Sequence, residues 1–247
     1  MVEGFGGYIG SGTIFIKREG SDGWTEIGNV TDFKINETEA DTKERISRMV
    51  GTYGQALDTQ RITKPPKISM TVDTLDPDNM AMALRGIVEK IERTAGSKSD
   101  IEITAVKGAY VELEDKFVKN VTVTSNDGTT TYEKGKDYKV NETLGLIKIL
   151  EDGSITDGEA LKVSYDYGVA TFYKIKGSKQ AQISCALKVE SRNEVNGKEL
   201  TIEIFKAVIS PAKEVSFITE DFNSIDLEGT IITPEGKDTG YIVTMRG

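Results

Sequence analysis

Short runs in which apolar and polar residues alternate constrain this chain more than any other feature of its sequence. In the run at 67–74, Ile68, Met70 and Val72 share one parity, and small polar residues occupy the other. Side chains alternate between the two faces of a β-strand, so this period indicates strands with one buried face. Further strand-like runs lie at 13–17, 28–36, 181–190, 199–208, 225–227, 230–233 and 241–245. We therefore predict a mainly β fold.

The alternating runs become shorter and more closely spaced between Gly108 and Gly168. Short alternating runs there are separated by Asp-Gly pairs at 127–128, 152–153 and 157–158. Such pairs supply the positive φ angles that tight hairpin turns require. Longer strands resume afterwards. We therefore predict an inserted small all-β domain at 108–168, within a larger β domain made of 1–107 and 169–247.

One helix is predicted after the strand at 67–74. Asp76 suits the N-cap, and Pro77 suits the first helical position. Apolar residues then recur every three or four positions as far as Ile91, and Gly96 suits the position just past a helix end. The spacing therefore predicts a helix over about 77–95.

A long polar segment occupies 37–64. It is rich in charge and shows no sustained apolar period. A structureless loop of this length is uncommon in a compact domain and tends to be functional. We therefore predict a functional loop.

The residue inventory removes much of catalytic chemistry. The 247 residues include no histidine, and Cys185 is the lone cysteine. A Ser-His-Asp triad, a Cys-His dyad, a His-containing metal site and an intrachain disulfide are therefore excluded. Paired carboxylates such as Glu112 and Glu114 keep a hydrolase open as a third hypothesis. We assign no catalytic, cofactor-binding or metal-ligating residue and expect no enzyme.

The net charge bears on partners. Lys and Arg total 31 against 40 Asp and Glu, which gives −9. Specific nucleic-acid binding needs clustered cations, and here they are scattered among acids. No run approaches the roughly 18 apolar residues of a membrane helix, and no secretory signal pattern opens the chain. We expect a protein made in a reducing cytoplasm, with no membrane partner.

Three smaller motifs have ordinary explanations. The Gly-rich start around 10–12 lacks the Gly-Lys-Ser/Thr of a phosphate loop, so we interpret it as a flexible lead-in. Residues 152–159 have calcium-like oxygen spacing but no closing Glu, so a hairpin turn is favoured. Cys185 falls on the apolar parity of its strand, which predicts a buried side chain.

The polar parity of the main strands carries small polar and acidic residues. A sheet with one apolar face and one small-polar, net acidic face suits a wide water-filled bore. An ordinary sandwich with a solvated face has the same pattern, and parity does not separate the two.

The order of the elements resembles the major tail tube proteins of long-tailed phages. The resemblance runs through Gly-Thr-Ile-Phe-Ile at 12–16, the strand at 24–33, the long loop after Asn36, the strand at 68–74 and the Asp76-Pro77 helix start. Ile-Ser-Pro-Ala at 209–212 and the residues at 221–229 resemble the closing segment of that family. The likeness covers 1–107 and 169–247, and the 108–168 block resembles small β inserts of phage virion proteins.

The resemblance implies a β-sandwich or barrel of two packed antiparallel sheets with one flanking α-helix. Six copies would form a ring, and stacked rings would form a tube in the virion. Double-stranded DNA would pass through its acidic-lined bore during ejection without specific binding, and other tail proteins would cap the tube ends. No cofactor is implied.

The same resemblance assigns two sets of residues. Those expected to face the lumen are Asp32, Lys34, Ser69, Thr71, Asp73, Ser184, Glu190, Glu199 and Glu203. Those expected in the inter-ring contact loop are Lys43, Glu44, Arg45, Arg48, Tyr53 and Arg61. The alternative is a surface adhesin or carbohydrate-binding β module, in which the insert is the recognition domain.

Overall fold

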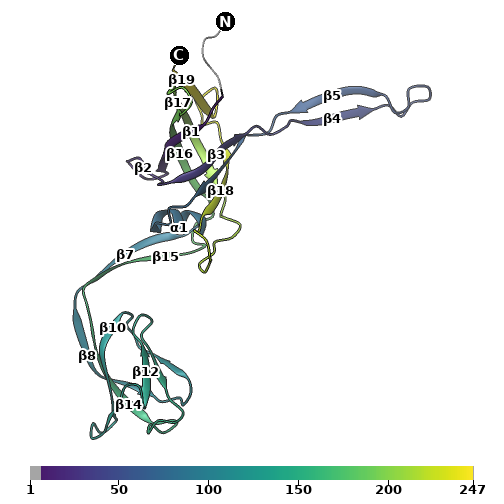
Figure 1. Cartoon of the computed structure of the whole chain (residues 1–247). Helices are drawn as coiled ribbons and strands as arrows, with labels where there is room; N and C mark the ends of the chain where they lie inside the picture. The colour runs from purple at the N-terminus through teal and green to yellow at the C-terminus, as the bar shows by residue number, and fades with distance from the viewer. Residues whose placement is uncertain (1–6, 247) are drawn as a thin grey trace. The chain divides into compact units, whose positions relative to one another are not determined.

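The computed structural model describes residues 7–246, which divide into two compact units (Figure 1). Unit 1 comprises Met1–Glu89 and Ile175–Gly247, and unit 2 comprises Lys90–Lys174. The structure is mainly β, with 52% strand and 3% helix, as the alternation predicted. Residues 1–6 of the predicted lead-in lie outside the described residues.

Unit 1 is built on one eight-stranded sheet in the order β2-β1-β16-β17-β18-β6-β3, with β19 also paired to β17. β17 pairs with β19 along its first half and with β18 along its second, so the sheet forms two layers. All of these strand pairs are antiparallel. The strands are β1 (Gly10–Arg18), β2 (Thr25–Glu26), β3 (Val30–Asn36), β6 (Lys67–Val72), β16 (Ile183–Asn193), β17 (Glu199–Ile209), β18 (Ile225–Ile231) and β19 (Tyr241–Met245).

One apolar core fills the space between the layers of unit 1. Ile16 from β1, Met70 from β6 and Leu187 from β16 are buried in the same cluster, although β1 and β6 lie far apart in the strand order. The sheet therefore curls around a shared core, and the predicted β-sandwich class is confirmed. Cys185 is buried in this core, and its burial raises the pKa of the thiol to about 12.

A close approach explains a glycine at the start of β1. The strand begins at Gly10, not at Thr13 as predicted. A Cβ on Gly12 would lie 2.4 Å from the carbonyl oxygen of Glu190 on the neighbouring strand. The glycine therefore belongs to the sheet, where only a hydrogen atom fits, and not to a flexible lead-in.

A β-bulge changes the parity of β3. The register on β6 shifts between Val30 and Asp32, so Val30, Phe33 and Ile35 all pack against the core. Thr31 is exposed and donates through its hydroxyl to the carbonyl of Thr71. Strict alternation over 28–36 would put Thr31 on the same face as Phe33, but the extra residue of a bulge reverses the faces that precede it.

Helix α1 (Pro77–Ala83) begins where predicted and ends much earlier. Asp76 is the N-cap, with its Oδ1 accepting from the Asn79 N–H at 2.7 Å. At the other end Arg85 takes a positive φ of 48°, and the Gly86 N–H bonds to the carbonyl of Ala81 at 2.7 Å. This six-to-one bond across a left-handed residue closes the helix as a Schellman motif.

The predicted continuation of the helix to about 95 is therefore wrong. Residues Ile87–Arg93 form strand β7, which pairs with β15 (Ala170–Lys176). The stop signal was hidden because Arg, rather than Gly, occupies the left-handed position. In the part of the chain that the structure describes, no helix is long and apolar enough to cross a membrane.

Unit 2 has a core of its own, formed by two small antiparallel sheets in the orders β11-β10-β14-β8 and β12-β13-β9. Its limits are wider than the predicted 108–168, because β8 pairs with β14 and belongs with it. The chain enters unit 2 in β7 and leaves it in β15. The strands are β8 (Gly96–Thr104), β9 (Tyr110–Glu112), β10 (Val118–Ser125), β11 (Thr131–Tyr132), β12 (Tyr138–Asn141), β13 (Leu146–Ile149) and β14 (Ala160–Tyr167).

Candidate functional site

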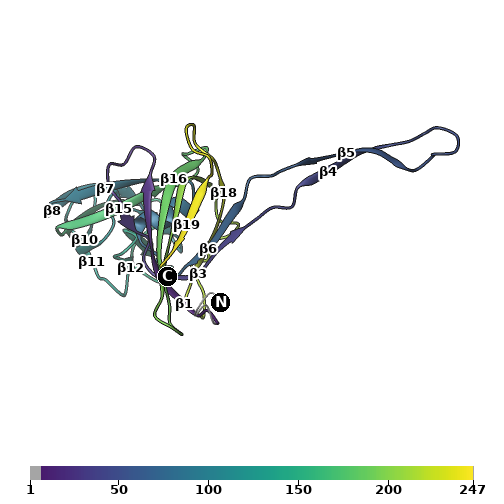
Figure 2. The same cartoon turned by 90° about the horizontal axis from the view of Figure 1, so that it is seen from above.

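The segment predicted as a loop at 37–64 contains a β-hairpin, which we call the arm (residues 41–62; Figures 1 and 2). β4 (Asp41–Ile46) pairs antiparallel with β5 (Ala56–Ile62), and among the described strands neither pairs with any other. The prediction of a structureless loop was wrong. A two-stranded arm buries neither face, so its sequence needs no apolar period and a search for that period misses it.

A hydrogen-bonded turn closes the arm. The Ser47 N–H donates to the carbonyl of Gln55 at 2.8 Å, and the Gly54 N–H donates to the carbonyl of Ser47 at 3.0 Å. The hydroxyls of Ser47 and Thr52 are hydrogen-bonded at 2.8 Å. Gly51 and Gly54 adopt the left-handed region that such a turn needs, with φ of 89° and 85°. The tip is therefore a defined surface.

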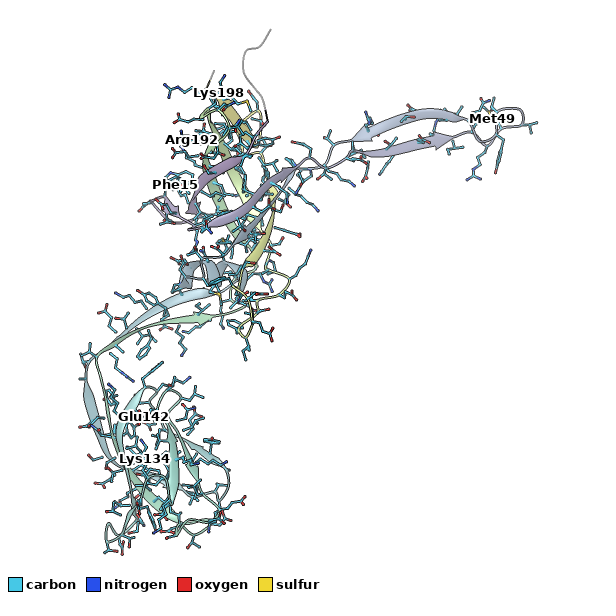
Figure 3. All side chains as sticks on the ribbon, viewed as in Figure 1. Phe15, Met49, Lys134, Glu142, Arg192 and Lys198 are labelled. Atoms are coloured by element: carbon cyan, nitrogen blue, oxygen red, sulfur yellow. The ribbon has the colours of Figure 1, made fainter. Side chains whose placement is uncertain are left out.

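Apolar side chains gather at this tip with nothing covering them. Val50 is fully exposed, Tyr53 is 71% exposed and Met49, labelled in Figure 3, is 61% exposed. Ile46 and Leu57, next to the turn, are also exposed. Grouped exposed apolar side chains mark interaction surfaces. Of these residues the sequence analysis singled out Tyr53 alone, because the others follow no period that points to one face.

All six residues predicted for the contact loop lie on the arm, and all are exposed. Lys43, Glu44 and Arg45 are on β4, Arg61 is on β5, and Arg48 and Tyr53 are in the tip. Within the described residues, none of the four cations lies within 4 Å of a carboxylate oxygen. Among the same residues, Glu44 and Asp58 on the arm are likewise outside any ion pair, so four free cations against two free acids leave the arm with a small excess of positive charge.

The base of the arm is held more firmly than its tip. Lys64 Nζ lies 2.5 Å from Asp41 Oδ1. The Tyr241 hydroxyl on β19 donates to Glu37 Oε1 at 2.5 Å. That hydrogen bond, together with partial burial, raises the pKa of Tyr241. The side chain of Tyr241 thus links Glu37, four residues before the arm, to the sheet of unit 1.

The outward face of the eight-stranded sheet is the second candidate surface, and it carries most of the predicted lumen residues. Lys188 and Glu203 are cross-strand partners with Nζ and Oε1 3.0 Å apart. Glu190 lies opposite Thr201 on β17. On the other side, Phe15 of β1, labelled in Figure 3, lies opposite Lys188. The face is therefore mixed in character, with an aromatic ring and a lysine among the acids.

The part of this face on β3 and β6 is polar and also charge-paired. Lys34 Nζ lies 2.5 Å from Asp32 Oδ2. Lys34 is also the register partner of Ser69. Thr71 Oγ1 donates to Asp226 Oδ1 at 2.7 Å.

Two expectations about this face need correction. Ser184 is buried at 7% exposure, so it does not present a polar group to solvent. The acids are not concentrated as unpaired charges: Asp32 and Glu203 are ion-paired with lysines, and Glu199 lies 3.2 Å from Arg246. Asp73 follows the end of β6 and accepts from the Asn29 amide at 2.6 Å. Three of the five predicted acids are therefore balanced locally, whereas Asp73 and Glu190 have no Lys or Arg nitrogen within 4 Å among the described residues.

Unit 2 holds the densest group of titratable side chains. Lys98 Nζ lies 2.6 Å from Glu114 Oε2 and 2.8 Å from Asp115 Oδ2. The Tyr165 hydroxyl donates to Asp115 at 3.0 Å, and burial followed by this bond raises the pKa of Tyr165 to about 12. Hydrogen bonding to Asp115, then to Glu114, raises the pKa of Lys98. These groups satisfy one another, so the cluster is structural.

The calcium-like spacing at 152–159 belongs to a turn. Asp157 Oδ1 accepts from the Lys107 N–H at 2.9 Å, and Glu159 Oε2 accepts from the Thr156 N–H at 2.8 Å. Glu159 also accepts from the Tyr132 hydroxyl, which raises the pKa of Tyr132 to about 12. Across residues 7–246, no group of three or more His, Cys, Asp or Glu side chains is placed to hold a metal ion.

Comparison with known families gives one result. Residues 7–242 match the family described as "Protein of unknown function UCP028589". The chain belongs to this family. The description assigns no activity to the UCP028589 family, and a comparison with curated proteins found no match. In this UCP028589 member, the arm and the outward sheet face are the two candidate functional surfaces.

Proposed function

We propose that this protein is a structural virion subunit that polymerises as stacked hexameric rings into the tail tube of a long-tailed phage. The observation that carries the proposal is the arm. It exposes Met49, Val50 and Tyr53 at its tip, and its strands pair with no other described strand. Such a tip gains stability only when another surface covers it, because burying apolar area is favourable and leaving it in water is not.

The sheet of unit 1 supports the same proposal. Short or open edges at β2 and β3 leave backbone groups available for lateral pairing between subunits. The outward polar face of one layer would line the bore, either that of β16 and β17 or that of β3 and β6 on the other layer. Its paired charges, such as Lys188 with Glu203, would give a lining that is polar and close to neutral. DNA would slide past such a wall because it offers no cluster of free cations to hold phosphates.

Removing the arm tests the proposal. A variant lacking 42–60, with the remaining ends joined by Asn-Gly, should keep the fold of unit 1, because the deleted residues contribute nothing to its core. Negative-stain microscopy should show hollow tubes for the intact protein and only rings or monomers for the variant. Tubes of normal length from the variant would refute the role of the arm.

Charge reversal tests the bore. Replacing Asp32, Asp73, Glu190 and Glu203 with Lys should leave tube formation intact and impair DNA ejection, because the lining would then bind phosphate. Replacing four exposed acids of unit 2, Glu102, Glu112, Glu133 and Asp152, with Lys in the otherwise unchanged protein provides a charge-matched comparison. Normal ejection by the sheet variant would contradict the lumenal placement.

A surface adhesin or carbohydrate-binding module is the second candidate. Unit 2 favours it, because this unit has its own core and exposes Tyr110, Phe117 and Tyr173. Exposed aromatic rings supply stacking surfaces for sugars. Specific glycan binding by the full chain, without assembly at any concentration, would favour this function over the tube.

A further inference from the structure

The segment between β17 and β18, residues 211–224, has no regular secondary structure but is anchored at several points. The Ala212 N–H donates to the carbonyl of Ala83 at the end of α1, at 3.1 Å. Val215 packs against the core of unit 1, and Lys213 Nζ lies 3.0 Å from Glu228 Oε1. The Asp221 N–H bonds to Thr219 Oγ1 at 3.0 Å. The segment is therefore a surface held in place by the sheet and the helix.

This segment exposes large apolar side chains without cover. Ile218 and Phe222 are almost fully exposed, and Phe217 is 72% exposed. A hollow of about 730 Å³ lies beside Phe222, and apart from Phe222 and Pro211 its lining is polar or charged. Three aromatic or branched side chains in water on one segment form the same kind of unfilled surface as the arm tip.

The charges of the segment are the opposite of those on the arm. Glu214, Glu220 and Asp221 have no Lys or Arg nitrogen within 4 Å among the described residues, whereas its one cation, Lys213, is paired with Glu228. On the arm, Arg48 lies in the apolar tip without a carboxylate oxygen of the described residues within 4 Å. Arg45 lies opposite Asp58 next to the tip, and Lys43 and Arg61 lie towards the base. Complementary charge around two apolar patches steers their association and fixes its register.

We propose that the arm tip of one copy docks on the 211–224 segment of the next copy. This inference rests on the proposed function and names the receiving surface that the tube needs. Met49, Val50 and Tyr53 would cover Phe217, Ile218 and Phe222. Arg48 and its neighbouring cations would face Glu220 and Asp221.

The two surfaces differ, so the contact is head-to-tail. Two surfaces of the same kind should not pair, because two arm tips would bring their Arg48 side chains together and two 211–224 segments would bring their acids together. A heterologous contact that does not close on itself produces an open stack. Every ring would then offer free arms at one end and free 211–224 segments at the other.

Site-directed cross-linking tests the docking. The buried native thiol is removed by Cys185→Ala, and single-cysteine proteins are made with Val50→Cys or with Phe222→Cys. Mixing the two under mild oxidation should give disulfide-linked dimers in high yield. Val50→Cys mixed with Val169→Cys, at an 81% exposed site in unit 2, is the matched control and should stay uncross-linked.

The outcomes separate this inference from the proposed function. Tubes seen by microscopy in the mixed sample, with no Val50–Phe222 cross-link above the control, would overturn the docking and leave the tube intact. Cross-linked dimers without tubes would support the docking and count against the tube. Absence of both would overturn both.

A charge swap gives a second readout. Arg48→Glu should raise the protein concentration needed for assembly by about tenfold, and so should Glu220→Arg with Asp221→Arg. The triple variant should recover most of that loss, because the opposite charges face each other again. Failure of the triple variant to recover, with each parent impaired and folded, would overturn the pairing.

Discussion

The apolar tip of the arm leads to a prediction whose size follows from the exposures of two side chains. Met49 is 61% exposed and Val50 is fully exposed, so Met49→Ser with Val50→Ser removes apolar area most of which the isolated chain leaves in water. Full burial of such a side chain contributes roughly 1.5–3 kcal/mol. Scaled by the two exposures, the double substitution should weaken each arm contact by about 2.5–5 kcal/mol, which is at least ~50-fold in its equilibrium constant.

The free energy of unfolding of the single chain should stay unchanged in the double variant. Surface substitutions usually change the free energy of unfolding by less than about 0.5 kcal/mol. A pelleting assay gives the protein concentration at which assembly begins, and urea unfolding gives the stability of the subunit. We expect the assembly concentration to rise at least ~50-fold and the free energy of unfolding to stay unchanged. Val169→Ser in unit 2 should alter neither.

An unchanged assembly concentration for the double variant, with its fold intact, would refute the argument. The exposed tip would then be an ordinary solvated hairpin end. A large fall in unfolding free energy would also count against it, because it would show that the tip packs within its own chain.

Three further predictions concern stability and reactivity. Gly145→Ala should lower the thermal stability of unit 2 far more than Gly128→Ala. Both glycines have positive φ, but only a Cβ at Gly145 would meet a backbone oxygen, at 2.0 Å. Equal losses of stability in the two variants would contradict this. Asp137→Ala should cost about 1–3 kcal/mol by urea unfolding, since its carboxylate accepts from two backbone N–H groups. Those bonds lower the pKa of Asp137, so its stabilising contribution is complete above the ordinary value of 3.8 and is lost as pH falls through the lowered one; a contribution that persists in acid would contradict this. Cys185, with its pKa raised to about 12 by burial, should resist thiol reagents at pH 8 until the chain is unfolded in urea, and rapid labelling of the native protein would show that the core is open.

Alternation in the sequence was sufficient to predict a strand wherever one face of the strand is buried and the other is exposed to solvent. Ile68, Met70 and Val72 are all buried, as their alternation predicted, and β16 follows the same rule from Cys185 to Glu190 but not at the buried Ser184. The N-cap of α1 was equally readable, because Asp76 and Pro77 act through local geometry. These features depend on neighbours a few residues away.

Features decided by tertiary structure were not readable. The helix stops at a left-handed Arg85, and the following β-branched residues become β7 because β15 is there to pair with them. The bulge at the start of β3 is set by its register on β6. No local pattern in the sequence reports either partner.

The candidate site was predictable in place but not in form. A long charged segment marked the arm, and all six residues chosen from it lie there. Its hairpin pairing and the apolar tip were missed, because a two-stranded arm that buries neither face does not show the hydrophobic pattern of a buried element. On the sheet face the positions were readable from parity, whereas pairs such as Lys188 with Glu203 depend on register.

Electron cryomicroscopy of the purified, concentrated full-length protein tests the central claim most directly. We predict hollow tubes of stacked six-fold rings, with the hairpin of residues 41–62 crossing from each ring to the next and its tip covered. A protein that stays monomeric at every concentration, or tubes in which that hairpin projects uncovered into solvent, would contradict the proposal that this chain assembles through its arm.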